Sequence, residues 1–106
     1  MKGGRMPAKR VYLATRDLMF RSKLIAAVTA AQGEVARDEA ACDLAVLELS
    51  GPEVVARVGA VVRRGVPVLA YGSHVRPELL AAARAAGAVA VPNSQVVERL
   101  ADLLKS

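Results

Sequence analysis

Short apolar runs alternate along the chain with segments in which apolar residues recur every three or four positions. The strongest runs lie at 10–15, 43–49, 66–71 and 88–91. Residues 44–47 are apolar at every position, as expected of a parallel strand buried on both faces. In the segment after the first run, Phe20, Leu24 and Val28 fall on one face of a helix. Strands separated by such helices predict βαβ units, and therefore a three-layer α/β fold with a parallel sheet.

The segment before residue 43 departs from this alternation. Residues 34–38 are a weak strand candidate, and only residues 39–42 separate them from the run at 43–49. A parallel crossover normally takes a dozen residues or more. Five peptide steps of ~3.3–3.6 Å span about 17 Å, which barely returns the chain to the other end of a short strand. We therefore expect a short second strand, joined to the third by an extended link without a regular helix.

Residues that favour helix ends mark the boundaries of the expected helices. Asp17 is placed to cap the first helix, and Ser50 with Glu53 forms a capping-box pattern before the second. Glycines end three of the helical patterns, at positions 33, 65 and 87. Ser94 is placed to cap the last helix. The inward stripe of that helix is expected at Val97, Leu100 and Leu104.

The 106 residues suffice for one domain with an aliphatic core, because 54% are hydrophobic and only 3% are aromatic.

The net charge of +5 arises at the start of the chain, where residues 1–10 hold four of the 15 basic residues and no acid. The remainder has 11 basic residues (15 minus 4) against 10 acidic ones. We expect residues 1–9 to be a flexible basic leader and residues 10–106 a single domain. A nearly neutral domain with few aromatic residues argues against nucleic-acid binding.

The chain lacks the features of several other protein classes. It has one cysteine, Cys42, and one histidine, His74, which excludes an intrachain disulfide and a Cys/His zinc site. No apolar run reaches the ~18 residues of a membrane span, and no apolar segment follows the basic start as in a secretory signal. We expect a cytoplasmic protein with no membrane partner. His74 is expected to be exposed in a turn, and Cys42 to be a small packing residue.

Four stretches of the chain resemble the receiver domain of two-component response regulators. They are RVYLATRDLMFR at 10–21, DLAVLELSGPE at 43–53, VPVLAYGSHVRPELLAAARAAGA at 66–88 and VAVPNSQVVERL at 89–100. The resemblance extends from Val11 to Leu104. It implies a flavodoxin-like (βα)5 sandwich with a parallel sheet in the strand order 2-1-3-4-5. The second helix of that fold is expected to be missing or vestigial here.

In receivers, two acids after the first strand and an aspartate ending the third bind Mg²⁺, and that aspartate accepts the phosphoryl group. The resemblance places Thr15-Arg16 at the acid pair, or Arg16-Asp17 if the register slips by one. The phosphoacceptor position falls on Glu48. An unpaired buried carboxylate is costly, and Arg16 ends the neighbouring strand at the same edge. We expect an ion pair between Arg16 and Glu48 in place of metal and phosphate, the alternative being that both are solvated.

The other functional positions of receivers are also altered. Gly72, with Ser73 beside it, stands where receivers carry a Thr or Ser after the fourth strand. The receiver lysine falls on Asn93, or on Ser94 in the other register. The resemblance therefore implies a degenerate receiver pocket with no catalytic residue, no metal ion and no cofactor.

Three functions are considered for such a chain. The first is a non-catalytic pseudo-receiver, a protein–protein interaction module in bacterial signalling that acts independently of phosphorylation. The alternative is an atypical receiver that is still phosphorylated, and a weaker alternative is a flavodoxin-like domain that binds a small ligand. FMN fits least, because the loop after the first strand has no glycine and Phe20 is its one aromatic residue.

Receivers commonly pair through the fourth helix, fifth strand and fifth helix, and we expect an interaction face there. Leu79 and Leu80 are adjacent on the expected fourth helix, about 100° apart, so both cannot point into one core stripe. The last helix has two adjacent apolar pairs of the same kind. We expect a semi-exposed apolar strip for a protein partner or a weak homodimer, formed by Leu79, Leu80, Val96 and Leu103.

Overall fold

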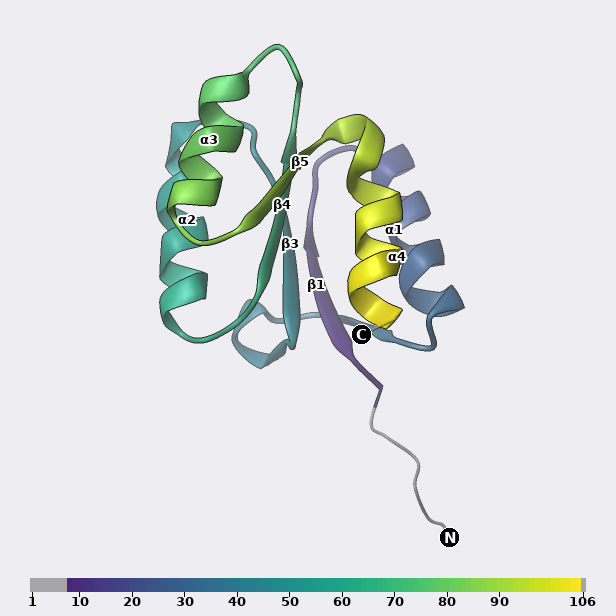
Figure 1. Ribbon diagram of the computed structural model, residues 1–106. Coiled ribbons are helices and arrows are strands. Elements are labelled where there is room, and N and C mark those ends of the chain that lie inside the picture. The colour runs from purple at the N-terminus through teal and green to yellow at the C-terminus, as the bar shows by residue number, and fades with distance from the viewer. Residues whose placement is uncertain (1–7, 106) are drawn as a thin grey trace, which may run out of the picture.

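The computed structural model describes residues 8–105 and shows a parallel sheet with helices on both faces (Figure 1). The strands are β1 (Arg10–Ala14), β2 (Glu34–Ala36), β3 (Leu44–Glu48), β4 (Val68–Gly72) and β5 (Val89–Pro92). The helices are α1 (Leu18–Ala30), α2 (Pro52–Arg63), α3 (Pro77–Ala85) and α4 (Val96–Lys105). The sheet order is β2-β1-β3-β4-β5, with every pair parallel. The expected fold class and strand order are confirmed.

The sheet separates two apolar cores. Along β1, Val11 and Leu13 point toward α1 and α4, whereas Tyr12 and Ala14 point toward α2 and α3. Strands β3 and β4 are buried on both faces, because each lies inside the sheet and is covered by helices on either side (Figure 1). This burial explains the continuous apolar runs. Because β1, β3 and β4 pair in parallel, their carboxyl ends lie at one edge of the sheet.

The prediction that a short link without a regular helix joins β2 to β3 is confirmed. It contains only a three-residue 3₁₀ turn, η1 (Glu39–Ala41). Glu39 ties this turn to α2, because its carboxylate accepts from Nε of Arg57 at 2.8 Å and lies 3.6 Å from Nη1 of Arg64. Arg57 also donates to the Tyr12 hydroxyl at 3.2 Å. The polar bridge Tyr12–Arg57–Glu39 therefore covers part of the β1 face that a second helix would cover.

Of the expected helix caps, only Asp17 is confirmed. Its carboxylate accepts from the backbone N–H groups of Met19 and Phe20 at 2.9 and 3.2 Å. The capping-box prediction at Ser50 is wrong, because Gly51 is the N-cap of α2 and no side chain caps it. The cap prediction at Ser94 is also wrong. Ser94 lies inside a second 3₁₀ turn, η2 (Asn93–Gln95), which leads directly into α4.

The glycines at the ends of α2 and α3 have the left-handed conformation expected of terminating residues. Gly65 has φ +85° and Gly87 has φ +105°. After α1, the left-handed residue is Gln32 (φ +62°) rather than Gly33. Gly33 instead donates its N–H to the carbonyl of Val28 at 2.8 Å, and thus lies close against the end of the helix.

The prediction of a semi-exposed apolar strip on the α3–β5–α4 face is wrong for three of its four residues. Leu79, Leu80 and Val96 are 5%, 6% and 0% exposed, and only Leu103 is half-buried. Adjacent residues can both be buried on α3 because this helix packs against β5 on one side and α2 on the other. The last helix is similarly enclosed by the sheet and α1, so its inward stripe is Val96 and Leu100, with Val97, Leu103 and Leu104 partly buried beside it.

The expected basic leader falls mostly outside the described residues, which begin at Ala8. Within residues 8–105, no helix is both long enough and apolar enough to cross a bilayer.

His74 is exposed in the turn after β4, as expected. Cys42 is half-buried beside η1, where burial raises the pKa of its thiol.

Candidate functional site

The candidate site lies at the edge where the parallel strands end. Glu48 is the last residue of β3, and Thr15 and Arg16 follow directly after β1. The register of these strands pairs Ala14 with Leu47, so the next residues along, Thr15 and Glu48, are side by side. Adjacent parallel strands thus bring together two of the positions that the receiver resemblance selects.

The Glu48 carboxylate is held by two hydrogen bonds on the same oxygen. Oε1 accepts from the Thr15 hydroxyl at 3.1 Å and from the backbone N–H of Arg16 at 2.8 Å. The expected ion pair is wrong in its donor, because no salt bridge joins the Arg16 guanidinium to Glu48 in the described structure. A backbone N–H at the end of β1 is already fixed by the sheet, whereas a guanidinium must lose rotamer freedom to make the same contact.

Among the described residues, the Asp17 side chain contacts the start of α1 and not Glu48. Its carboxylate caps α1, and its own backbone N–H donates to Thr15 Oγ1 at 3.3 Å. The Thr15 hydroxyl therefore accepts from the start of α1 while it donates to Glu48. This arrangement links the end of β1, the end of β3 and the first turn of α1.

The remaining positions selected by the resemblance are not hydrogen-bonded to Glu48. Gly72 ends β4 and is buried, and a Cβ built on it would lie 3.2 Å from Cβ of Leu49. The Ser73 hydroxyl accepts from the N–H of Val75 at 3.2 Å, so it stabilises its own turn. Asn93 and Ser94 lie in η2. Of the eight selected positions, Thr15, Arg16 and Glu48 are therefore joined by hydrogen bonds, and the other five are not bonded to Glu48.

Tyr71 is a polar residue of this region that the sequence analysis did not select. It is 1% exposed, and its ring lies 5.6 Å from that of Phe20, centroid to centroid. Its hydroxyl is the one buried side-chain oxygen or nitrogen without a hydrogen-bond partner in residues 8–105. Burial raises the pKa of Tyr71 to about 12, with Thr15 close enough to oppose the shift. A tyrosine in an otherwise aliphatic strand was the signal available in the sequence.

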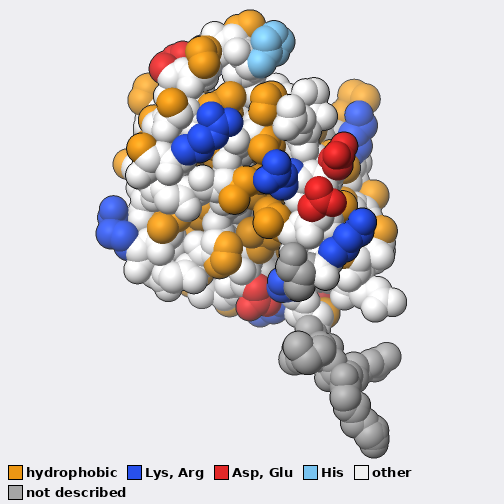
Figure 2. Space-filling model, in the orientation of Figure 1, with side chains coloured by type: hydrophobic (Ala, Val, Ile, Leu, Met, Phe, Trp, Pro, Cys, Tyr) orange, Lys and Arg blue, Asp and Glu red, His pale blue; other side chains and the backbone are white. Residues whose placement is uncertain are grey.

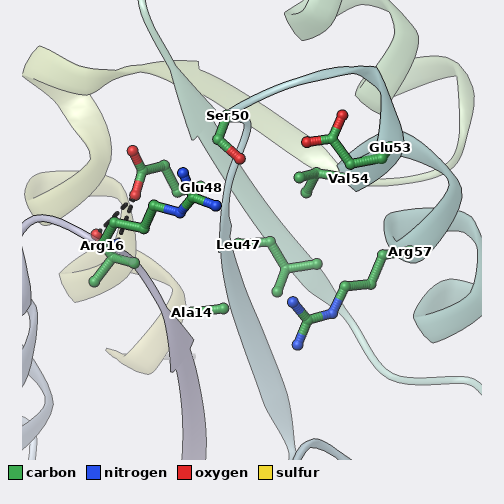
Figure 3. Close-up of a pocket in the computed structure, with 9 residues that line it drawn as sticks. Ala14, Arg16, Leu47, Glu48, Ser50, Glu53, Val54 and Arg57 are labelled. Carbon is green, nitrogen blue, oxygen red and sulfur yellow. Dashed lines mark hydrogen bonds between the residues drawn. The ribbon is translucent and has the colours of Figure 1, made fainter.

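A pocket of about 390 Å³ opens beside Glu48, between the ends of β1 and β3 and the first turns of α2 (Figure 3). Ala14, Leu47 and Val54 give it apolar walls. Its polar lining is formed by Thr15, Arg16, Glu48, Ser50, Glu53 and Arg57. Figure 3 shows the Arg57 side chain pointing from α2 toward this space. Glu53 and Arg57 were missed as site residues because helix α2 brings them in, whereas Ser50, in the loop before α2, was read as a helix cap.

Comparison with solved structures identifies the fold. A response regulator from Thermotoga maritima superposes with a TM-score of 0.76 at 15% identity, over 93% of this chain and 96% of that chain. The signal receiver domain of NarL from Mycobacterium tuberculosis gives 0.64 at 21% identity, over 93% and 98%. The chain has the receiver fold. NtrX from Brucella abortus gives 0.71 at 17% identity over 93% of this chain but 26% of its own, longer chain.

No family model and no curated protein matches the sequence. The likeness is therefore one of fold, and the chemistry must be argued from the residues present.

The Mg²⁺ ion that receivers bind does not fit the residues at this edge. Mg²⁺ is usually bound through one or two carboxylates that are free to coordinate it, with waters completing an octahedral shell. Here Asp17 caps α1, and Glu48 already accepts two hydrogen bonds. Across residues 8–105 there is no group of three or more His, Cys, Asp or Glu side chains placed to hold a metal ion. We derive no step through a metal at this site.

Proposed function

We propose that this chain is a pseudo-receiver: a non-catalytic protein–protein interaction module of bacterial signalling that acts without phosphorylation. The observation that supports this proposal is the state of Glu48. Its carboxylate stands at the phosphoacceptor position and is already satisfied by the Thr15 hydroxyl and the Arg16 N–H. A carboxylate held by donors of the chain itself supports a module that acts without phosphorylation.

The experiment that tests this proposal is incubation with acetyl phosphate and Mg²⁺, followed by intact mass measurement. We expect no mass gain of a phosphoryl group, both in the wild type and in Glu48→Gln. A catalytically competent receiver under the same conditions is the positive control. A phosphoryl adduct on the wild type that Glu48→Gln abolishes would establish the alternative, an atypical phosphorylated receiver.

We also propose that the face formed by α3, β5 and α4 is where a protein partner or a second copy binds. With Leu79, Leu80 and Val96 buried, the support comes from a groove along the β5 edge rather than from an apolar strip. The groove is lined by Arg84 and Arg99 on its two sides and by half-exposed Val89. Figure 2 views this side of the molecule and shows basic groups beside apolar side chains.

The β5 edge is closed to strand addition, which defines the kind of contact that the groove can make. Arg84 donates from Nε and Nη2 to the carbonyl of Ala90, at 3.2 and 2.8 Å. Pro92 has no N–H to donate. Edge strands blocked by an arginine and a proline do not pair with another strand, so contacts there use side chains.

A further inference from the structure

The pocket beside Glu48 lies at the carboxyl ends of β1 and β3, on the side of the sheet that α2 covers. Its remaining lining comes from Ser50 and the first turns of α2. Its volume of about 390 Å³ lies in the range of small-molecule sites, which combine apolar walls with a few fixed polar groups. Ala14, Leu47 and Val54 supply such walls here.

Two charges of opposite sign in this pocket are held by other residues of the chain. Arg57 is held by Glu39 through a 2.7 Å ion pair and by the Tyr12 hydroxyl at 3.2 Å, and its guanidinium lies over the Tyr12 ring at 5.7 Å. On the strand side, Glu48 is held by Thr15 and the Arg16 N–H through Oε1. Both groups are therefore positioned before any ligand arrives, which lowers the entropy cost of binding.

Two further charged groups line the pocket without partners of their own. The Arg16 guanidinium and the Glu53 carboxylate form neither a salt bridge nor a side-chain hydrogen bond to any residue from 8 to 105. In Figure 3, the Arg16 guanidinium extends from the end of β1 toward the space in front of Leu47, and Arg57 approaches from α2. Each fixed charge is thus supplemented by an unpaired group of the same sign.

We propose that this pocket binds a small zwitterion, specifically an α-amino acid with an apolar side chain. Its carboxylate binds Arg16 and Arg57, its ammonium group binds Glu53, and its side chain packs on Ala14, Leu47 and Val54. A plain anion meets repulsion from the two carboxylates, and a metal cation meets repulsion from the two guanidinium groups. A ligand with both charges pairs with groups of both signs at once. This inference goes beyond the proposed pseudo-receiver role and does not depend on it.

The test uses three matched probes and backbone amide NMR of the ¹⁵N-labelled chain. L-leucine carries both charges, N-acetyl-L-leucine lacks the ammonium group, and L-leucinamide lacks the carboxylate. We expect saturable shifts with L-leucine at residues 14–16 and 47–57, with an affinity in the millimolar to micromolar range. Each derivative is expected to bind about tenfold more weakly or worse, because it loses its charge-assisted hydrogen bonds.

Variants locate the binding within the pocket. Arg16→Gln and Glu53→Gln each remove an unpaired charge that holds no part of the fold, and each is expected to weaken L-leucine by about tenfold. Arg63→Gln, an exposed change on α2 outside the pocket lining, is the matched control and is expected to bind as the wild type does.

Three outcomes would overturn the proposal. They are the absence of saturable shifts with millimolar L-leucine, equal binding of either derivative, and shifts that appear only with Mg²⁺ or inorganic phosphate. Undiminished binding by both pocket variants would also overturn it. The phosphorylation experiment on Glu48 is read separately by mass, so its result and this one can fail independently.

Discussion

Glu48 depends on one side-chain donor, the Thr15 hydroxyl, and on one backbone donor, the Arg16 N–H. We predict that Thr15→Val lowers the free energy of unfolding by about 1 kcal/mol, because a half-buried carboxylate then loses one of its two donors. Thr15→Ser keeps the hydroxyl and is expected to lie closer to the wild type. Urea unfolding of the three proteins measures the difference. Equal losses in the two variants would show that the hydroxyl does not support Glu48.

Tyr71 makes the opposite case, a buried hydroxyl without a partner. We predict that Tyr71→Phe leaves the free energy of unfolding unchanged or raises it by about 1 kcal/mol, since no hydrogen bond is lost and a buried polar group is removed. The matched control is Tyr12→Phe, which breaks the bond from Arg57 and is expected to destabilise. A clear loss of stability in Tyr71→Phe would mean that its hydroxyl is hydrogen-bonded in solution.

The same residue predicts a pH dependence. Burial raises the pKa of Tyr71 from 10.0 to about 12, so above pH 10 the unfolded chain loses this proton more readily than the folded one. The stability contributed by the neutral hydroxyl is complete below pH 10 and is lost as the pH rises from 10 to 12. The fall in stability across this window should be smaller in Tyr71→Phe, as measured by thermal unfolding at several pH values.

At the scale of elements, two glycines with the same conformation offer a test of packing. Gly65 after α2 and Gly87 after α3 both have positive φ, so alanine at either costs about 1 kcal/mol of backbone strain. A Cβ at position 65 meets nothing within 4 Å, whereas one at position 87 lies 2.8 Å from Cγ1 of Val62. We predict that Gly87→Ala destabilises more than Gly65→Ala in urea unfolding. Equal losses would place Val62 away from the end of α3.

The η1 turn gives a second prediction at this scale. Glu39 is its anchor, through Arg57 and Arg64. Exposed ion pairs contribute little to global stability, so Glu39→Gln is expected to change it by less than about 1 kcal/mol. Amide hydrogen exchange across residues 37–43 should nevertheless become faster, while the β3 and β4 amides stay protected. Glu98→Gln on α4 is the control, and uniform exchange in all three proteins would show that the turn is held otherwise.

The order of strands and helices was predictable because each buried strand of a parallel sheet is apolar on both faces, as at 44–47. The short link before β3 was predictable from chain length alone. The first residues of the helices were less predictable. Ser50 and Ser94 match capping patterns, yet Gly51 is the N-cap of α2 and Ser94 lies within the η2 turn. A cap depends on local backbone geometry, which several residue types satisfy, so the residue type at one position is a weak guide.

For the whole molecule, the candidate site was predictable only in part. Sheet topology brings Thr15 and Glu48 together, and the strand order implied by the receiver resemblance is enough to infer that. The choice between a guanidinium and a backbone N–H as donor depends on ångström-scale geometry that residue types do not contain. Arg57 and Glu53 line the pocket because α2 packs beside the strand ends, which the sequence pattern does not reveal. Leu79 and Leu80 are both buried because α3 packs against β5 and against α2.

The last prediction concerns association of the whole molecule through the groove along β5. If a second copy binds there, sedimentation equilibrium of the wild type should show a weak monomer–dimer exchange that Val89→Glu abolishes, because a charge replaces the apolar residue exposed on β5. Leu80→Glu cannot serve as the test variant, since Leu80 is buried and the change would unfold α3. Leu18→Glu is the matched control, because Leu18 is 77% exposed at the start of α1, away from the groove. A dimer that survives Val89→Glu but is lost in Leu18→Glu would move the interface to α1, and a monomer at every concentration would leave the groove to a different protein.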